Sequence, residues 1–392
     1  MFNVGRKFKK EKNNKNMIKV QFGRPDITSK EINAVVKVLK NPILAHGPLS
    51  QKFEKLFAKY TGAKFATTVS SCTAGMHLFY LANNIKRGDE VIVTSQSHIS
   101  TAHSISLTGA KPIFVDCNSY NGTIDTNKIE KKINKRTKAI SLVHHLGNPA
   151  DMNKVTEIAK NYKLLVLEDC ATALGSKIYN KHVGNFGDVG VFSFYPIKHI
   201  TTGEGGIIIS NNKKLIDKIN KLKAFGVNKS YLKRRIPGEY DADLLGLNYR
   251  MNEISSALGI EQIKRFPKFL SIRKKNFEYI MSKVKQKKNF EIVKFEDKNF
   301  HGSYYCLCLL IKDQKINRLD IINKFNKAGV GTSIYYPKPI PEMNYYKKKF
   351  GYSSKMYKNA EKFSYRSIAL PIGTHVKKKD LNLIVNTINR IF

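Results

Sequence analysis

Short apolar runs, rich in β-branched residues, recur through the first two-thirds of the chain. Most of them are apolar throughout rather than alternating, which is typical of strands buried on both faces. The pattern predicts seven strands, at residues 64–69, 90–94, 112–116, 139–143, 164–168, 189–194 and 206–210.

Segments with helical spacing separate most of these strands. They lie at residues 74–83, 97–108, 126–133 and 151–162. Alternating strands and helices predict an α/β fold with a mainly parallel seven-stranded sheet and helices on both faces. Only about a dozen residues join the last two strands, so we expect the last one to run antiparallel.

The pattern changes after residue 211. Helices are predicted at 213–223, 252–285, 318–328 and 379–391, and strands at 304–311 and 332–336. We therefore expect a disordered basic tail at 1–17, a large domain at 18–265 and a smaller C-terminal α/β domain at 266–392. A polar stretch at 228–243 is expected to form a mobile loop.

Charge is the unusual feature of the composition. The 392 residues include 69 Lys and Arg against 30 Asp and Glu, which gives a net charge of +39. Such an excess can indicate a nucleic-acid binder. Only 12 of the 69 are arginines, however, and the lysines are spread along the chain, whereas phosphate clamps favour Arg. Nucleic acid is therefore not the expected partner.

The location of the protein is predicted from what the sequence lacks. No apolar run approaches the roughly 18 residues of a membrane-spanning helix, and the N-terminus lacks the apolar core of a signal peptide. The five cysteines show no metal-binding spacing. We expect a cytoplasmic protein with reduced thiols, no membrane span and no metal.

Small and hydroxyl-bearing residues follow the first predicted strand. Ser70, Ser71, Cys72 and Thr73 open the next predicted helix. Free N–H groups and the positive end of the helix dipole form a cradle for phosphate at such a position. Ser and Thr also cap helices for structural reasons, so this pattern by itself leaves both interpretations open.

A carboxylate and a lysine follow two later strands. Asp169 directly follows the fifth predicted strand, where a buried carboxylate needs a cationic partner or strong donors. Lys198 comes four residues after the sixth strand, before a glycine-rich turn, and partial desolvation would make its amine nucleophilic. A phosphate cradle, an acid and a nucleophilic amine are together what pyridoxal 5′-phosphate (PLP) requires, so PLP is the expected cofactor.

Four ordered motifs resemble the DegT/StrS group of nucleotide-sugar aminotransferases, including its perosamine-synthase-like members. The motifs are Val69-Ser-Ser-Cys-Thr-Ala-Gly-Met-His77, Val166-Leu-Glu-Asp-Cys-Ala171, Phe192-Ser-Phe-Tyr-Pro-Ile-Lys198 with Thr201-Thr-Gly-Glu-Gly-Gly206, and Gly246-Leu-Asn-Tyr-Arg-Met251. The resemblance implies the fold type I of PLP-dependent transferases and a homodimer with shared active sites. It also implies transfer of an amino group from L-glutamate to a keto-6-deoxy-hexose nucleotide in surface-polysaccharide biosynthesis.

The resemblance assigns roles to individual residues. Lys198 matches the lysine that binds the cofactor covalently and later moves a proton, and Asp169 matches the partner of the ring nitrogen. Contacts with the cofactor phosphate are implied for Cys72, Thr73 and Ser193, and, from the neighbouring subunit, for Asn248.

Several positions depart from the usual pattern of the family. His98 stands where an aromatic residue usually stacks on the cofactor ring, and Thr172 where Gln or His lies near its O3′ atom. Both are expected to contact the cofactor. Tyr335 and Ile340 replace histidines often placed near the sugar, so Tyr335 is a predicted substrate contact and the exact sugar stays open.

Two further groups have competing interpretations. Arg234 and Arg235, in the polar stretch, could bind the substrate diphosphate or be solvated loop charges. His144 and His145, at the end of the fourth strand, could touch cofactor or substrate, but packing and loop hydrogen bonds are favoured.

Two rival functions remain from the sequence. A PLP enzyme on the same scaffold could aminate a smaller phosphorylated ketone or dehydrate a sugar. The sugar-dehydrating branch typically has His in place of the lysine, so Lys198 argues against it, although His199 is adjacent. The rival from another class is a non-catalytic regulator or nucleic-acid binder.

Overall fold

The structure is a computed structural model that describes residues 18–45, 47–228, 236, 238–285, 287–294, 299–353 and 356–392. The predicted tail at 1–17 lies outside the described residues. So does 229–235 of the predicted loop, with Arg234 and Arg235.

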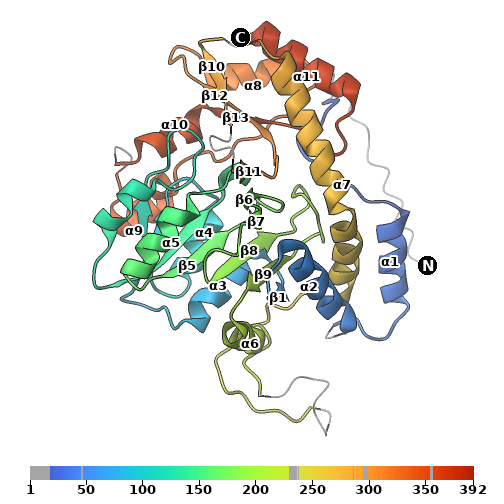
Figure 1. The fold of residues 1–392 in the computed structure, drawn as a ribbon, viewed down its shortest axis with the longest axis vertical. Coiled ribbons are helices and arrows are strands. Elements are labelled where there is room, and N and C mark those ends of the chain that lie inside the picture. The colour runs from blue at the N-terminus through green and yellow to red at the C-terminus, as the bar shows by residue number, and fades with distance from the viewer. Residues whose placement is uncertain are drawn as a thin grey trace, which may run out of the picture.

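Most of the predicted elements occur in the structure, together with helices and short strands that the sequence pattern did not indicate (Figure 1). The helices are α1 (Ser29–Leu39), α2 (Pro48–Thr61), α3 (Cys72–Ala82), α4 (Ile99–Ser106), α5 (Met152–Asn161), α6 (Lys213–Leu222), α7 (Glu253–Lys283), α8 (Arg318–Lys327), α9 (Asn344–Phe350), α10 (Lys358–Arg366) and α11 (Lys378–Ile391). The strands are β1 (Phe65–Val69), β2 (Glu90–Thr94), β3 (Lys111–Val115), β4 (Thr137–Val143), β5 (Leu165–Asp169), β6 (Lys177–Ile178), β7 (Lys181–His182), β8 (Val189–Ser193), β9 (Gly206–Ser210), β10 (Phe290–Ile292), β11 (Phe300–His301), β12 (Leu307–Ile311) and β13 (Ser367–Leu370).

The seven predicted strands form one sheet in the order β1-β9-β8-β5-β4-β2-β3. The pairs β2–β3, β2–β4, β4–β5 and β5–β8 are parallel. Strand β9 runs antiparallel to both of its neighbours, β1 and β8, as expected from the short connection before it. The predicted mainly parallel α/β sheet is therefore confirmed.

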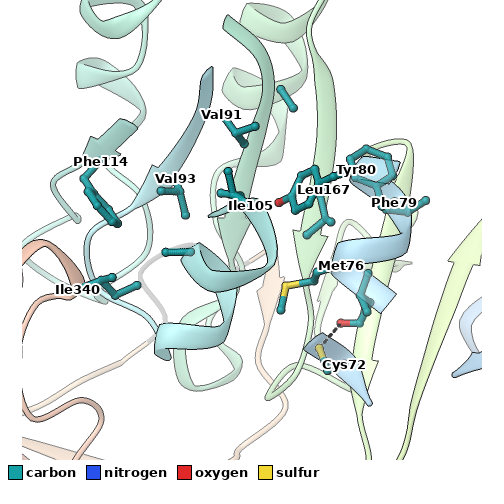
Figure 2. Packing of buried hydrophobic residues seen from close by; sticks show 14 of the residues in the cluster. Cys72, Met76, Phe79, Tyr80, Val91, Val93, Ile105, Phe114, Leu167 and Ile340 are labelled. Carbon is teal, nitrogen blue, oxygen red and sulfur yellow. Dashed lines mark hydrogen bonds between the residues drawn. The ribbon is translucent and has the colours of Figure 1, made fainter. Parts of the chain in front are cut away.

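Apolar side chains cover both faces of this sheet. Along β9, Ile208 packs into the core under α3, α4 and α6, whereas Ile207 and Ile209 pack into the core under α2, α5 and α7. Neighbouring residues of a strand point to opposite faces, so a strand covered on both sides must be apolar throughout. Figure 2 shows the first of these cores, where Cys72, Met76 and Leu167 lie in one cluster.

A separate small sheet, β10-β12-β13, lies in the C-terminal part and packs with α8, α11 and the end of α7. Helix α7 is continuous from Glu253 to Lys283, so the predicted boundary at 265 falls inside it. The division into two domains at this residue stays a prediction.

Three predicted elements differ in the structure. Residues 126–133 form two 3₁₀ turns, Thr126–Lys128 and Glu130–Lys132, rather than one α-helix. The predicted strand at 304–311 begins only at Leu307, because Ser303 and Tyr305 bond to the large sheet's loops and to α7 instead. The predicted strand at 332–336 is reduced to an isolated bridge between Ser333 and Ala369.

Helix α7 also fixes the start of α2. The Glu253 carboxylate accepts hydrogen bonds from the N–H groups of Leu49 (2.8 Å) and Ser50 (3.0 Å), in the first turn of α2. A carboxylate satisfies the free donors of a helix N-terminus and complements its dipole. Gly47 is required beside it, because a Cβ there would lie 2.4 Å from the Glu253 carboxylate.

Two predictions about location and redox state can be compared with the structure. No helix within the described ranges is both long and apolar enough to cross a membrane. All five cysteines are buried and unpaired.

The N-terminus of α1 is tied to α7 through a buried carboxylate, Glu31. Its oxygens accept hydrogen bonds from Thr28 N (2.8 Å), Arg265 Nη1 (2.5 Å) and Gln262 Nε2 (3.0 Å). Burial by itself would raise the pKa of Glu31, but the bonds from Thr28, Arg265 and Gln262 outweigh it and lower the pKa to about 2. The ionised form therefore stabilises the fold.

We expect Glu31→Gln to lower the free energy of unfolding at pH 7 by about 2 kcal/mol, because a neutral amide meets donors arranged for a carboxylate. The pKa in the folded chain lies below its ordinary value of 4.5, so the contribution is complete above pH 4.5 and is lost as the pH falls toward 2. Urea unfolding of both proteins at several pH values measures this.

Glu278→Gln provides the control, because Glu278 is exposed and its ion pair with Lys274, at i,i+4 spacing, is weak: the two charged atoms lie 3.8 Å apart. An equal effect of the two substitutions, or a difference that does not change with pH, would contradict the assignment.

Candidate active site

The carboxyl ends of parallel strands meet at one edge of the main sheet, and the chemistry-bearing residues lie there. Asp169 is the last residue of β5 and Ser193 the last of β8. Strand β1 ends at Val69, and α3 starts three residues later. Ligands of open α/β sheets bind beyond this edge.

The start of α3 forms the predicted cradle. Ser71 caps the helix, its hydroxyl accepting from Ala74 N at 3.1 Å. The N–H groups of Cys72 and Thr73 come before the first possible intrahelical acceptor, so they are available to a ligand. Gly206 passes so close that a Cβ there would lie 2.6 Å from Cys72 N.

Asp169 is buried and surrounded by donors. It accepts from Thr101 Oγ1 at 2.9 Å, from Ala171 N at 3.0 Å and more weakly from Cys72 Sγ at 3.9 Å. Burial, with the Asp169 charge added, raises the pKa of the Cys72 thiol well above its ordinary value. Cys72 is therefore a neutral donor, and Asp169 is suited to remain an anion.

Lys198 follows β8 in a tight turn, in which its N–H donates to Tyr195 O at 2.9 Å. The Thr201 hydroxyl donates to Phe194 O at 2.9 Å and closes the loop. The half-buried Nζ atom lies 5.4 Å from the centre of the Tyr305 ring. Within the described part of the chain, Lys198 forms no ion pair.

Burial lowers the pKa of the Lys198 amine, and the charges of Asp169 and Cys72 oppose this shift. A lower pKa increases the fraction of neutral amine, which is the form that attacks carbonyl groups. The lysine is therefore chemically suited to the role that the sequence predicts.

The neighbouring His199 has a different environment. It is buried, and its Nε2 lies 2.9 Å from Ser303 O. Burial lowers the pKa of this imidazole well below its ordinary value, so it is neutral and its Nε2 proton is committed to the Ser303 carbonyl. Lys198, rather than His199, thus presents a reactive nitrogen near Asp169.

Three other predicted cofactor contacts lie around this edge. Ser193 is half-buried and its hydroxyl accepts from Tyr195 N at 3.4 Å. His98 is exposed and caps α4 through Ser100 N at 3.2 Å. The Thr172 hydroxyl is buried and donates to His144 O at 3.3 Å.

The predicted substrate contacts are partly engaged within the chain. Tyr335 is buried, with its hydroxyl 2.8 Å from that of Tyr305. Ile340 is fully buried in the core, where Figure 2 shows it near Phe114. Arg234 and Arg235 lie outside the described residues.

Asn248 is exposed, and its Oδ1 accepts from Arg250 Nε at 3.1 Å. The adjacent Tyr249 O accepts from Ser70 N at 2.8 Å, so this segment lies beside the start of α3.

A second buried carboxylate, Glu168, has a structural role. It accepts from the N–H groups of Gly184 (2.6 Å), Phe186 (2.8 Å) and Gly187 (2.7 Å) and lies 2.9 Å from His144 Nε2. His144 Nδ1 accepts from a backbone N–H, so Nε2 carries the proton. Cys170 is also near, but the oxygens of Glu168 already have four donors, so we assign no metal to this group.

The structure adds residues that the sequence did not single out: Ser97, Thr101, Tyr305 and Tyr336. Tyr336 is half-buried, with its ring 5.7 Å from that of His98 and 6.2 Å from that of His145. His145 is buried, and burial lowers the pKa of its ring to about 3, so it packs as a neutral group. Thr101 could have been suspected because it follows His98 by three residues, whereas the two tyrosines are brought to the site only by the fold.

The sequence and the fold of this chain resemble those of known proteins. Residues 25–389 match the model of the DegT/DnrJ/EryC1/StrS aminotransferase family. GDP-perosamine synthase of Escherichia coli O157:H7 is 35% identical over 94% of this chain and 97% of its own. A UDP-4-amino-4,6-dideoxy-N-acetyl-beta-L-altrosamine transaminase of Campylobacter jejuni is 32% identical over 94% of this chain and 96% of its own.

The solved structure of Helicobacter pylori PseC, an aminotransferase involved in the biosynthesis of pseudoaminic acid, has the same fold. Its TM-score is 0.88 at 29% identity, with 95% of this chain and 99% of that chain covered.

Proposed function

The chain belongs to the DegT/DnrJ/EryC1/StrS aminotransferase family, and we propose that it aminates a keto-6-deoxy-hexose carried on a nucleotide, with L-glutamate as the amino donor. The family is PLP-dependent. The observation that carries the proposal is the meeting of Lys198, Asp169 and the start of α3 at one edge of the sheet.

The residues present fit PLP. The cofactor has three polar parts: a phosphate, a ring nitrogen and an aldehyde. The N–H groups of Cys72 and Thr73 suit the phosphate, the Asp169 carboxylate suits a protonated ring nitrogen, and the Lys198 amine suits the aldehyde. Ser193, His98 and Thr172 stay predicted contacts around these three.

The chemical roles of the chain's own residues follow from their environments. Bound PLP supplies an electron-withdrawing ring that makes the Cα–H bond of the amino donor acidic. Lys198 in its neutral form would take that proton as a general base and, once protonated, would return it to C4′ of the cofactor as a general acid. Asp169 stays ionised beside Thr101 and Ala171 and holds the ring-nitrogen proton.

The proposed acceptor, a nucleotide-linked sugar, is supported by the relatives. Two of them are named for acting on GDP- and UDP-linked sugars. Since a diphosphate needs cations, the net charge of +39 also favours an anionic acceptor. The predicted contacts of Tyr335 and of Arg234 and Arg235 with the sugar nucleotide remain part of this proposal. So does a role in surface-polysaccharide biosynthesis.

A homodimer with shared sites is also part of the proposal. The chain between α6 and α7 projects from the body of the molecule at the bottom of Figure 1. Between these two helices the sequence has exposed apolar side chains, among them Phe225 (49% exposed) and Leu245 (95% exposed). Exposed apolar side chains on a projecting segment favour contact with another chain. Asn248 lies in the same segment, so a second copy could receive it.

We expect borohydride reduction of the purified holoenzyme to attach the cofactor to Lys198, because its amine is near the cradle and forms no ion pair with any residue that the structure describes. Peptide mapping by mass spectrometry identifies the lysine. Lys198→Arg should carry no label, since a guanidinium is not nucleophilic at this pH.

Lys223→Arg is the matched control for the label. Burial also lowers the pKa of Lys223, but its Nζ atom lies 2.8 Å from Thr68 O and 3.6 Å from Glu54. This variant should keep the label at Lys198; a label found at Lys223 in the unmodified enzyme would refute the assignment.

The substrate class is tested with glutamate and a panel of 4-keto-6-deoxy sugars linked to GDP, UDP or dTDP. We expect mass spectrometry to find one or more amino-sugar nucleotides together with 2-oxoglutarate. Turnover of a small phosphorylated ketone, with none of the sugar nucleotides accepted, would overturn the acceptor and leave the aminotransferase chemistry in place.

Asn248→Ala should weaken cofactor binding by roughly tenfold if its amide bonds to the partner's cofactor phosphate. Hybrids of Asn248→Ala with Lys198→Ala subunits test the sharing. In a shared arrangement both losses fall in one site and the other site is intact, so the active site of the hybrid should bind the cofactor as tightly as the unmodified enzyme does. A hybrid whose active site binds the cofactor as weakly as Asn248→Ala would mean that Asn248 acts within its own subunit.

A further inference from the structure

Two buried hydroxyl groups, of Ser97 and Thr101, form a chain of hydrogen bonds that ends at Asp169. The Thr101 hydroxyl, in the first turn of α4, is 2.9 Å from Asp169 Oδ2. The Ser97 hydroxyl, just before the helix, is 2.7 Å from Thr101 Oγ1. Ser97, Thr101 and Asp169 are each at most 2% exposed, so solvent is not their partner.

The direction of these hydrogen bonds can be derived. An ionised carboxylate only accepts, and a hydroxyl has one proton, so Thr101 gives its proton to Asp169. Thr101 then accepts from Ser97. The chain of donors has a single polarity, from Ser97 through Thr101 to Asp169, and each bond polarises the next.

The two oxygens of Asp169 are used unequally. Oδ1 accepts from Ala171 N at 3.0 Å and from Cys72 Sγ at 3.9 Å, whereas Oδ2 accepts from Thr101. A carboxylate has about four acceptor positions, two on each oxygen. Cys72 Sγ also lies 3.8 Å from Val191 O, but both it and Ala171 N approach Oδ1, whereas among the described residues Thr101 alone bonds to Oδ2. Oδ2 is therefore the oxygen with more room for a further donor.

We propose that Thr101 is a positioning residue: its hydroxyl, oriented by Ser97, holds Asp169 so that Oδ2 meets the ring nitrogen of the cofactor. This inference rests on the proposed pairing of Asp169 with that nitrogen. It adds the oxygen that makes the contact and the residues that orient it.

The consequence is measurable as a pH dependence of cofactor binding. Donors to a carboxylate favour its ionised form, so loss of the Thr101 hydroxyl makes the form of Asp169 that pairs with the ring nitrogen less favourable. Protonated Asp169 no longer attracts a protonated ring nitrogen, and binding weakens as the pH falls. The acid limb of the binding profile therefore moves to higher pH in a variant without this donor. The other titratable groups that face Asp169 are Lys198, Cys72, His98, Tyr80, Cys170 and Tyr336.

The test measures the dissociation constant of PLP for the apoenzyme by fluorescence quenching across a pH series. Thr101→Val keeps the side-chain shape and removes the hydroxyl. We expect about tenfold weaker binding at neutral pH and an acid limb about one pH unit higher. Thr101→Ser restores the donor and should return both values to within about twofold of the unmodified enzyme.

Ser104→Ala is the matched control. Ser104 is buried on the same helix, but its hydroxyl donates to Thr101 O at 3.0 Å and not to Asp169. This variant should leave both the affinity and the acid limb unchanged. An unchanged acid limb in Thr101→Val, or an equal shift in Thr101→Ser or Ser104→Ala, would overturn the inference.

Two further variants keep the test decisive. If Thr101→Val does not fold, as the melting temperature of its apoenzyme would report, Ser97→Ala must move the acid limb in the same direction, and no movement overturns the inference. Asp169→Asn distinguishes a failure of the proposed pairing of Asp169 with the ring nitrogen from a failure of the proposed role of Thr101. If Asp169→Asn leaves PLP affinity as in the unmodified enzyme, the proposed pairing itself fails; if it weakens binding while Thr101→Val does not, only the role of Thr101 fails.

Discussion

The common direction of the parallel strands is the constraint on which the site depends. Strands β4, β5 and β8 are neighbours in the sheet and parallel, so their carboxyl ends must lie side by side. Asp169 and Ser193 reach one edge for this reason alone. The apolar cores on both faces then hold the strand ends in place, because each strand is covered above and below.

Two adjacent carboxylates show how strand geometry separates structure from chemistry. Glu168 and Asp169 are neighbours in β5 and therefore point to opposite faces of the sheet. Glu168 meets His144 and three backbone N–H groups, which hold residues 184–187 against the strand. Asp169 meets the thiol of Cys72 and the hydroxyl of Thr101 and keeps one oxygen incompletely used. The pleat gives the first carboxylate a structural role and the second a role in binding.

Burial sets the charge state of the site more than the net charge of the chain does. The chain carries +39, yet the surroundings of Lys198 lower the pKa of its amine. The imidazole of His199, one residue later, has a pKa well below its ordinary value because it is fully enclosed. Lys198 remains half-buried near Asp169, so the two adjacent residues have different chemistry here: the lysine amine is available to react, and the imidazole packs as a neutral group.

The sequence by itself determined the sheet and the position of its ends. Buried parallel strands must be apolar throughout, and all seven could be identified; the residues that follow β1, β5 and β8 identified Cys72, Asp169 and Lys198. Two features it could not determine were the start of β12 and the engagement of the Tyr335 hydroxyl by Tyr305. The sequence likewise could not show that Thr101 bonds to a carboxylate 68 residues away, or that the His199 ring bonds to the Ser303 carbonyl. Local patterning reports which side chains are buried, but a hydrogen-bond partner distant in the chain is chosen only when the elements pack together.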